Sequence, residues 1–334
     1  MYVVSPLSRL PLMARQYRSS RDDSALDSAH TSWYTAAVVT NEAPMVAVLE
    51  DRILIPSKED HYMYYRVHNP EALGGKTPLI CVHGMAGNSA CFDYLGRAVS
   101  DFPVVSVDVV GRGKSSWLRD HSLYNYNTYC TDILHLAKHL KIKKCNYLGV
   151  SMGGIIAMFL TAHFHDVLSI EKLILNDIGP YTPAQPLQAL VKLMTQLPTF
   201  DGKEQAKQYL KDALRHSGIV EEEHWDHLVR HRIVEKDGGY VLTLDPGIGA
   251  QLSAEIQQSS SGDWDIWDVW DKMQCGGILV LKGEHSAYLT SETLRKMLAS
   301  KRDISHIEYP GTGHPPSVMV ESRIRDVQQF IRED

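Results

Sequence analysis

The chain has 334 residues, of which 44% are hydrophobic and 22% charged, and its formal net charge is −6. This is the composition of an ordinary water-soluble globular protein, and the negative charge gives no electrostatic reason to expect nucleic acid as a partner. The length suits one large α/β core with an inserted subdomain, or two domains of ordinary size.

The five cysteines are odd in number and widely scattered along the chain. They form neither a disulfide framework nor a CxxC metal site. We therefore expect no metal, no cofactor and a reducing, intracellular compartment. The sequence carries no signal for an oligomeric state.

Residues 1–45 differ in composition from the rest of the chain. The part before Asp22 contains Arg9, Arg15 and Arg18, four serines and no acidic residue. This composition is typical of an organelle-targeting presequence, which would place the protein in mitochondria. A disordered N-terminal extension of a cytoplasmic protein is the alternative that we favour.

Eight segments have the pattern of β-strands. Apolar residues alternate over 46–55 and 61–67, which predicts a hairpin. Short, mainly apolar runs, typical of strands buried on both faces, follow at residues 78–82, 104–110, 145–150, 173–175 and 278–281. A last strand is expected at residues 306–309, ahead of Gly311-Thr312-Gly313-His314. A helix is expected from about Tyr126 to Leu140. Because strands alternate with helices, we predict a mostly parallel sheet whose strand carboxyl ends meet at one edge.

Residues 181–271 interrupt this alternation. Their pattern is helical, with many Gln, Glu and Lys residues, and the stretch is far too long for a connecting loop. We therefore predict a helical cap over 181–271 on an α/β core formed by residues 46–180 and 272–334.

Two side-chain clusters of the cap receive structural interpretations. Three tryptophans recur at every third residue: Trp264, Trp267 and Trp270. We expect them to pack the cap onto the core rather than to contact a substrate. His224, His227 and His231 fall on one helical face, but no second cluster completes a metal site, so we interpret this helix as a solvated one.

The longest apolar passage runs from Tyr147 to Phe164, and Ser151 and three glycines interrupt it. We interpret it as a buried strand that turns into a buried helix, not as a membrane span. The spacing Gly149-x-Ser151-x-Gly153 suits a sharp strand-to-helix turn, because a strained backbone at the serine leaves no room for side chains two residues away. The hydroxyl would then lie beside the free amides of the helix N-terminus, which predicts a nucleophile.

Four passages, taken in order, resemble the α/β-hydrolase superfamily over roughly residues 46–331. They are His83-Gly84, Asp108-x-x-Gly111-x-Gly113-x-Ser115, Gly149-Val150-Ser151-Met152-Gly153 and Gly313-His314. The resemblance implies the α/β-hydrolase fold, with an eight-stranded, mostly parallel sheet, helices on both faces and the helical cap after strand 6.

The same resemblance implies the parts of a catalytic site. Ser151 is the expected nucleophile, and His314, after the last strand, is the expected general base. The backbone amides of Met85 and Met152 would form the oxyanion hole. A serine hydroxyl needs an imidazole to take its proton, and a carboxylate must hold that imidazole in the right tautomer.

The carboxylate is the point at which this chain departs from similar proteins. They carry an aspartate just after the seventh strand, where this chain has Ala287. Some superfamily members place the acid after the sixth strand instead, and Asp177 occupies that position here. Glu284 is a second substitute, longer by one methylene. We favour Asp177, with Glu284 or the lack of any functional acid as alternatives.

The sequence thus predicts a serine hydrolase that cleaves a small carboxylic ester through an acyl-enzyme intermediate on Ser151. A thioesterase, a lactonase or a C–C bond hydrolase would use the same serine. Ala287 motivates one competing hypothesis, a catalytically weakened α/β-hydrolase fold that binds a small ligand without turning it over. The expected partner is a small molecule with an acyl group.

Overall fold

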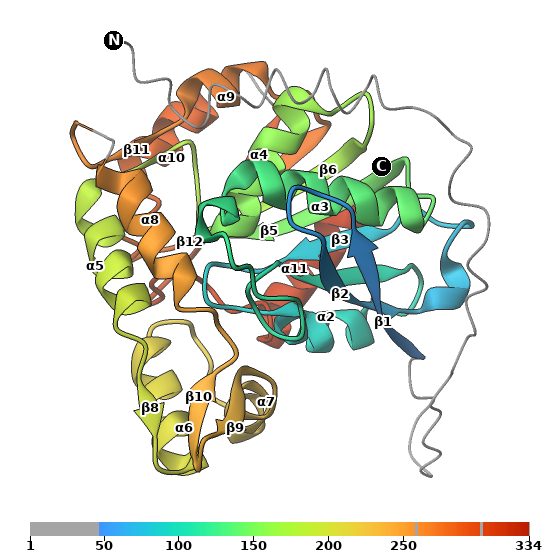
Figure 1. Ribbon diagram of the computed structural model, residues 1–334. Helices are drawn as coiled ribbons and strands as arrows, with labels where there is room; N and C mark the ends of the chain where they lie inside the picture. The colour runs from blue at the N-terminus through green and yellow to red at the C-terminus, as the bar shows by residue number, and fades with distance from the viewer. Residues whose placement is uncertain (1–46, 258–259, 301–302, 334) are drawn as a thin grey trace.

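The computed structural model describes residues 47–257, 260–300 and 303–333. Its centre is an eight-stranded sheet in the order β1-β2-β4-β3-β5-β6-β12-β13 (Figure 1). The strands are β1 (Val48–Ile55), β2 (His61–His68), β3 (Leu79–Val82), β4 (Val104–Asp108), β5 (Lys144–Val150), β6 (Ser169–Asn176), β12 (Gly277–Gly283) and β13 (Ile304–Tyr309).

The pairing of these strands confirms the predicted sheet. Strands β1, β2 and β4 pair antiparallel, and the other neighbouring pairs are parallel. All eight predicted strand segments coincide with strands of this sheet. The predicted N-terminal extension over residues 1–45 lies outside the described residues.

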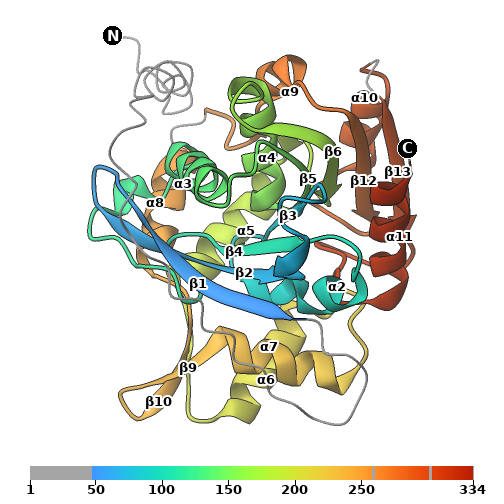
Figure 2. The ribbon, with the colours of Figure 1, turned by 90° about the vertical axis from the view of Figure 1, so that its right-hand side faces the viewer.

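Side-chain alternation along the central strands sorts the core into two layers. In β3, Ile80 and Val82 belong to one buried cluster, and Leu79 and Cys81 belong to another on the opposite face. The first layer is covered by α3 (Tyr126–His139), α4 (Met152–His163), α9 (Trp267–Lys272) and α10 (Ser291–Leu298), and the second by α2 (Asp93–Ala98) and α11 (Glu321–Arg332). Figure 2 shows α3 and α4 on one side of the sheet and α2 and α11 on the other. Burial on both sides is the reason that these strands are continuous apolar runs.

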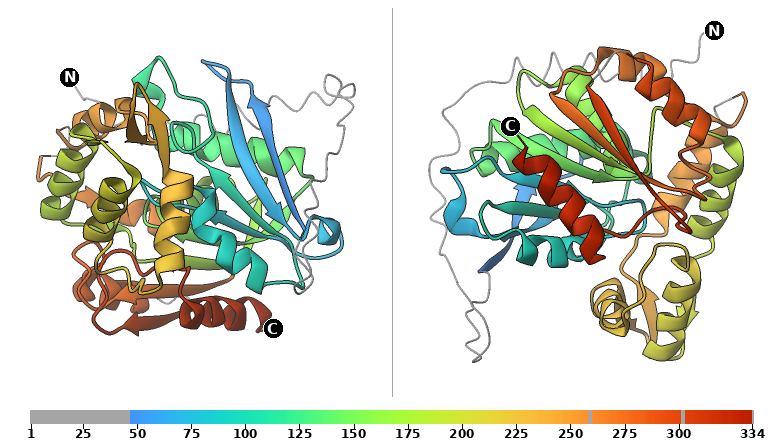
Figure 3. Two further views of the ribbon diagram at one scale, coloured as in Figure 1. Left: turned by 90° about the horizontal axis from the view of Figure 1, so that it is seen from below. Right: turned by 180° about the vertical axis from the view of Figure 1, so that it is seen from behind.

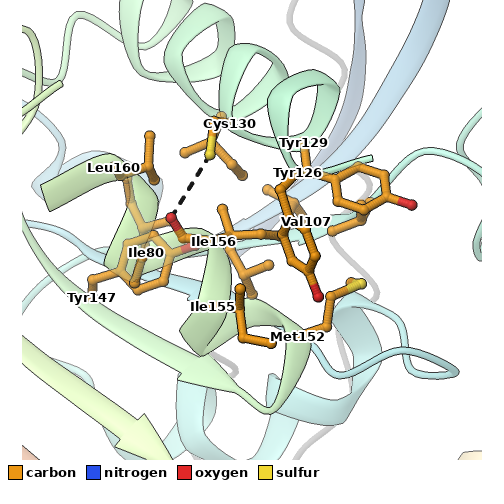
Figure 4. Close-up of a cluster of buried hydrophobic side chains, with 14 of the residues drawn as sticks. Ile80, Val107, Tyr126, Tyr129, Cys130, Tyr147, Met152, Ile155, Ile156 and Leu160 are labelled. Carbon is orange, nitrogen blue, oxygen red and sulfur yellow. Dashed lines mark hydrogen bonds between the residues drawn. The ribbon is translucent and has the colours of Figure 1, made fainter. Parts of the chain in front are cut away.

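Helix α4 lies in the middle of the first layer. Its residues from Met152 to Thr161 are all buried. Figure 4 shows side chains of α4 packed against the sheet and α3; the labelled contacts include Ile80, Val107, Tyr126, Tyr129, Tyr147, Ile155, Ile156 and Leu160. The longest apolar passage of the sequence is therefore strand β5 followed by a core helix, as predicted. Within the described residues, no helix combines the length and the apolar character needed to cross a membrane.

The segment between β6 and β12 contains four helices ahead of α9: α5 (Ala184–Thr195), α6 (Lys203–Ala213), α7 (Glu222–Arg232) and α8 (Gly247–Gln257). It also contains a three-stranded antiparallel sheet of β8 (Thr199–Phe200), β10 (Gly239–Leu242) and β9 (Ile233–Lys236), which the sequence analysis did not include. Helices α5 and α8 lie side by side, and the small sheet lies beyond their ends with α6 and α7 (Figures 1 and 3). The division of the chain into a core and a cap over 181–271 stays a prediction.

The tryptophans of the insertion pack against the core, as expected. Trp270 is fully buried in the first layer, and its ring lies edge-on to that of Trp267. The ring of Trp264, in the short strand β11 (Trp264–Asp265), lies 5.2 Å from the ring of Tyr126 on α3.

The histidines of α7 differ from the expectation of a solvated helix. His227 is buried, and its Nε2 lies 2.9 Å from the Ala90 carbonyl oxygen and 3.4 Å from a carboxylate oxygen of Asp93. The prediction of a solvated helix was wrong for the face of α7 that carries His227. This face packs on the core because Trp225 and Leu228 of the same helix are buried there.

Candidate active site

Ser151 lies at the sharp turn between β5 and α4. Its backbone has φ 49° and ψ −112°, a conformation that residues with side chains rarely adopt. A Cβ added at Gly149 would lie 2.4 Å from the Gly154 amide nitrogen, and one at Gly153 would lie 2.1 Å from the Val82 carbonyl oxygen. Both glycines are thus required by close backbone approach, which is the constraint that the sequence spacing indicated.

Three side chains from distant parts of the chain form a hydrogen-bonded chain at the carboxyl edge of the sheet. The Nε2 of His314 lies 2.9 Å from the Ser151 Oγ, and its Nδ1 lies 2.7 Å from the Asp177 Oδ2. Ser151 follows β5, Asp177 follows β6 and His314 follows β13. Because parallel strands end at one edge, three turns that are far apart in sequence meet there.

Asp177 is fully buried, and both of its carboxylate oxygens are occupied. Oδ2 faces His314, and Oδ1 accepts a hydrogen bond of 2.9 Å from the Gly283 amide. The Asp177 amide itself donates to the Leu281 carbonyl oxygen at 2.7 Å. The carboxylate is therefore held by the neighbouring strand β12 on one side and the imidazole on the other. Its φ of 59° is in the left-handed region that aspartate tolerates better than most residues.

The second acid candidate, Glu284, does not take this place. Glu284 accepts a hydrogen bond of 2.7 Å from the Gly311 amide and lies 3.7 Å from the His285 Nε2, and 46% of its side-chain surface is exposed. Ala287 is exposed and has no polar side chain. Of the two candidate carboxylates, the structure brings only Asp177 to His314.

Two backbone amides at this edge are available to bind an oxyanion. Met152 is the first residue of α4, so its amide has no partner within the helix. Met85 lies in the loop after β3, where a Cβ added at Gly84 would lie 3.4 Å from the Ser151 Cβ. The amide of Met85 donates none of the loop and turn hydrogen bonds of the described residues. Both expected donors thus belong to segments that adjoin Ser151, and their role in an oxyanion hole stays a prediction.

Buried polar side chains brace the Met85 loop. Arg112, fully buried, donates from Nε to the Met85 carbonyl oxygen at 3.0 Å. The His83 Nδ1 lies 2.7 Å from the Gly84 carbonyl oxygen, and its Nε2 accepts from the Val109 amide at 3.0 Å. Burial lowers the pKa of His83 to about 3, so this imidazole stays neutral and acts as a fixed hydrogen-bond bridge.

Sequence reasoning missed Tyr288 as a neighbour of the site. Its ring stacks on the His314 imidazole, with 3.9 Å between ring centroids and 20° between planes. Its hydroxyl donates to the Pro186 carbonyl oxygen of α5 at 3.1 Å. Tyr288 therefore links the catalytic histidine candidate to the insertion. Its position one residue after Ala287 was the only sequence signal for this role.

A cavity of about 340 Å³ opens onto Ser151 and His314. Its walls come from the strand-end loops of the sheet on one side and from α5, α6 and α7 of the insertion on the other. This volume is in the range of small-molecule sites. Sequence reasoning also missed Arg232, at the end of α7, which lines the cavity.

Among the described residues, one group of side chains has the geometry to hold a metal ion: Asp93, His227 and His231. Asp93 already accepts two hydrogen bonds of 2.6 Å from the Arg66 guanidinium. The group also lies outside the residues that line the cavity. We therefore assign it to the packing of α7 on the core.

Comparison with known proteins agrees with this architecture. A family model described as the alpha/beta hydrolase fold matches residues 77–230. A 3-hydroxybutyrate-oligomer hydrolase from Cupriavidus necator is 30% identical over 262 residues, which cover 76% of this chain and 87% of the relative. The chain belongs to the α/β-hydrolase fold family.

Solved structures of other α/β hydrolases extend the likeness. A protein from Rickettsia typhi is 30% identical to this α/β hydrolase, with a TM-score of 0.77 over 86% of this chain and 99% of the other. The structure of E-2-(acetamidomethylene)succinate hydrolase has a TM-score of 0.72 over 86% of this chain and 100% of the other, at 21% identity. The second likeness shows the fold alone.

Proposed function

We propose that this α/β hydrolase is a serine hydrolase that cleaves a small carboxylic ester through an acyl-enzyme on Ser151. One observation carries the proposal: a single imidazole lies 2.9 Å from the Ser151 Oγ and 2.7 Å from the buried Asp177 carboxylate. This is the arrangement by which an imidazole removes a hydroxyl proton while a carboxylate stabilises the imidazolium.

The first half of the reaction forms the acyl-enzyme. The Ser151 Oγ attacks the ester carbonyl carbon as its proton passes to the His314 Nε2. The carbonyl oxygen becomes an oxyanion, and the amides of Met85 and Met152 donate hydrogen bonds to it. Collapse of the tetrahedral intermediate breaks the bond to the alcohol oxygen, which takes the proton from His314 and leaves as the free alcohol.

The second half returns the enzyme to its starting state. A water molecule gives a proton to His314 as its oxygen attacks the acyl carbon. The new tetrahedral intermediate collapses, the bond to the Ser151 Oγ breaks, and the serine oxygen regains its proton from His314. The products are a carboxylic acid and the free enzyme.

Two further observations support an ester as the substrate. Most of the side chains that line the cavity beside Ser151 are apolar, among them Leu190, Leu193 and Leu210 from α5 and α6, which suits a short acyl chain. The Cupriavidus necator relative is named a 3-hydroxybutyrate-oligomer hydrolase, and hydroxy acids are joined to one another through ester bonds. The contact of Asp177 with His314 supports a hydrolase over a protein that only binds its ligand, because it supplies the carboxylate that Ala287 lacks.

Labelling with a fluorophosphonate probe and hydrolysis of p-nitrophenyl butyrate test this function. Wild type is expected to be labelled once and to release p-nitrophenol, and Ser151→Ala is expected to lose the label and at least about a thousandfold of kcat/KM. Ser317→Ala, at another serine that lines the cavity, is the matched control and should still be labelled. Equal labelling of wild type and Ser151→Ala would rule out Ser151 as the nucleophile.

A further inference from the structure

The cavity beside Ser151 contains one permanently charged side chain. Among the described residues that line it, Arg232 is the only Asp, Glu, Lys or Arg. The other side chains that line the cavity are mainly apolar, with a few neutral polar groups such as those of Tyr209 and Ser217. A guanidinium in such surroundings is costly unless a negative charge accompanies it.

No carboxylate of the described residues pairs with Arg232. It takes part in none of their ion pairs, whereas Arg66, Lys207 and Lys282 each have a carboxylate partner. Its terminal nitrogen donates to the Ala86 carbonyl oxygen, and its buried Nε has no hydrogen-bond partner. A guanidinium has five N–H donors, and within the described part of the chain most of those of Arg232 have no protein acceptor.

The groups nearest to Arg232 cannot neutralise it. The ionisable neighbours that favour its charge are the Cys91 thiol and the Tyr209 hydroxyl. Burial raises the pKa of both, so both are neutral near pH 7. Burial also lowers the pKa of the Arg232 guanidinium itself, although arginine keeps its proton at any physiological pH. The cavity therefore holds an unbalanced positive charge.

This charge lies close to the proposed oxyanion donors. Arg232 ends α7, and its side chain contacts Ala86, the residue after Met85. The same loop approaches the serine at Gly84, where an added Cβ would lie 3.4 Å from the Ser151 Cβ. Ser151 and Arg232 line the same cavity, so a ligand that fills the cavity from Ser151 meets the guanidinium.

We propose that Arg232 binds a free carboxylate of the substrate, so that the substrates are small esters that carry a negative charge. Two unused N–H donors of a planar guanidinium match the two oxygens of a carboxylate. Oligomers of short hydroxy acids with a free carboxyl end are one such class of ester. The inference builds on the proposed ester hydrolysis, and it adds the chemical class that the cavity selects.

Matched esters test the selection in turnover. One pair has the charge in the acyl part: mono-p-nitrophenyl succinate and its neutral analogue p-nitrophenyl succinamate. The other has it in the alcohol part: the linear dimer of 3-hydroxybutyrate and its primary amide. For wild type we expect kcat/KM to be at least about tenfold higher for the carboxylate in one pair, and the pair that shows it tells which side of the ester faces Arg232.

Substitution of Arg232 tests whether this residue provides the selection. In Arg232→Met, the ratio of kcat/KM for the carboxylate ester to kcat/KM for its amide should fall at least about tenfold. In Arg232→Lys, which keeps the charge, the same ratio should fall less. Arg230→Met is the matched control, because Arg230 lies on the same helix, is exposed and does not line the cavity. Its ratio should equal that of wild type.

A binding measurement separates this inference from the proposed chemistry. In Ser151→Ala, which should not turn over, calorimetry is expected to show the 3-hydroxybutyrate dimer binding at least about tenfold more tightly than its amide, and Arg232→Met in the same background should abolish the difference. Charge-dependent binding without any hydrolysis by wild type would refute the ester hydrolase and leave the anion site standing. The anion site would be refuted if kcat/KM were equal for carboxylate and amide in both pairs and Ser151→Ala bound the dimer and its amide with equal affinity. This conclusion would hold whether or not the protein hydrolyses esters.

Discussion

The loops after β6 and β12 each carry a carboxylate that was a candidate for the catalytic acid, and the two side chains have opposite surroundings. Asp177, after β6, is fully buried, with His314 at one oxygen and the Gly283 amide at the other. Glu284, after β12, has nearly half of its side chain exposed and accepts from the Gly311 amide. The β12 loop does contribute to the site, but through a backbone amide and the ring of Tyr288.

The difference shows what an acid needs to support an imidazole. It must be fixed in position, and its second oxygen must be satisfied so that the first stays aimed at the imidazole. Asp177 meets both conditions because β12 lies directly beside β6 in the sheet. Glu284 has the charge, but its hydrogen bond to Gly311 turns it toward the loop after β13.

Removal of the buried Asp177 carboxylate should have the largest effect on activity, and it tests the difference between Asp177 and Glu284 most directly. Asp177→Asn should lower kcat for p-nitrophenyl butyrate by about 10³- to 10⁴-fold, because the amide favours the wrong imidazole tautomer while leaving the shape unchanged. Steady-state kinetics, with circular dichroism to verify folding, provide the measurement. A loss of less than about tenfold would mean that another group supports His314.

Removal of the stacked ring should have a smaller effect. Tyr288→Leu is expected to lower kcat by about three- to tenfold with little change in KM, since an aromatic contact of this kind stabilises the imidazole position by about 1 kcal/mol. Tyr288→Phe keeps the ring, loses only the hydrogen bond to Pro186, and should retain most of the activity. Equal losses in the two variants would assign the role to the hydroxyl.

A third carboxylate, Glu255 on α8, tests the effect of burial on a carboxyl group that has no proposed role in catalysis. Burial raises its pKa to about 7 from an ordinary value of 4.5, while a hydrogen bond from Gln251 lowers it. As pH rises from 4.5 to 7, the unfolded chain releases this proton before the folded chain does, so the free energy of unfolding should fall over that interval. Glu255→Gln should flatten the fall by about 1 to 3 kcal/mol, as measured by urea unfolding at pH 5 and pH 8. An unchanged slope would show that the carboxyl is already ionised.

The exposed carboxylate should matter least. Glu284→Gln is expected to change kcat/KM by less than about threefold, because it removes a charge from a side chain that contacts neither His314 nor the cavity lining. The same assay as for Asp177→Asn is used. A large loss here, combined with a small one for Asp177→Asn, would reverse the assignment of the two loops.

Much of the fold follows from local sequence patterns. The buried strands are short apolar runs because both of their faces are covered, and the turn at Ser151 needs Gly149 and Gly153 because backbone atoms approach within 2.5 Å of the position that a Cβ would take. At Gly149 the approaching atoms belong to Gly153 and Gly154, a few residues along the chain, whereas at Gly153 they belong to Val82 of β3. The sequence displays the spacing of the glycines, and the packing of β3 explains the second one. The helical pattern of the insertion was visible in the sequence as well, whereas its small sheet was not, since strands of two to four residues leave almost no periodic signal.

The sequence by itself determined the sheet, the serine turn and the order of the motif-bearing loops, because each depends on the conformation of a short stretch of chain. Only the tertiary structure decided between Asp177 and Glu284, set Tyr288 against His314 and left Arg232 unpaired in the cavity. These features depend on which strands and helices become neighbours, and the same carboxylate or guanidinium is a support, a surface charge or an anion site according to the groups that surround it.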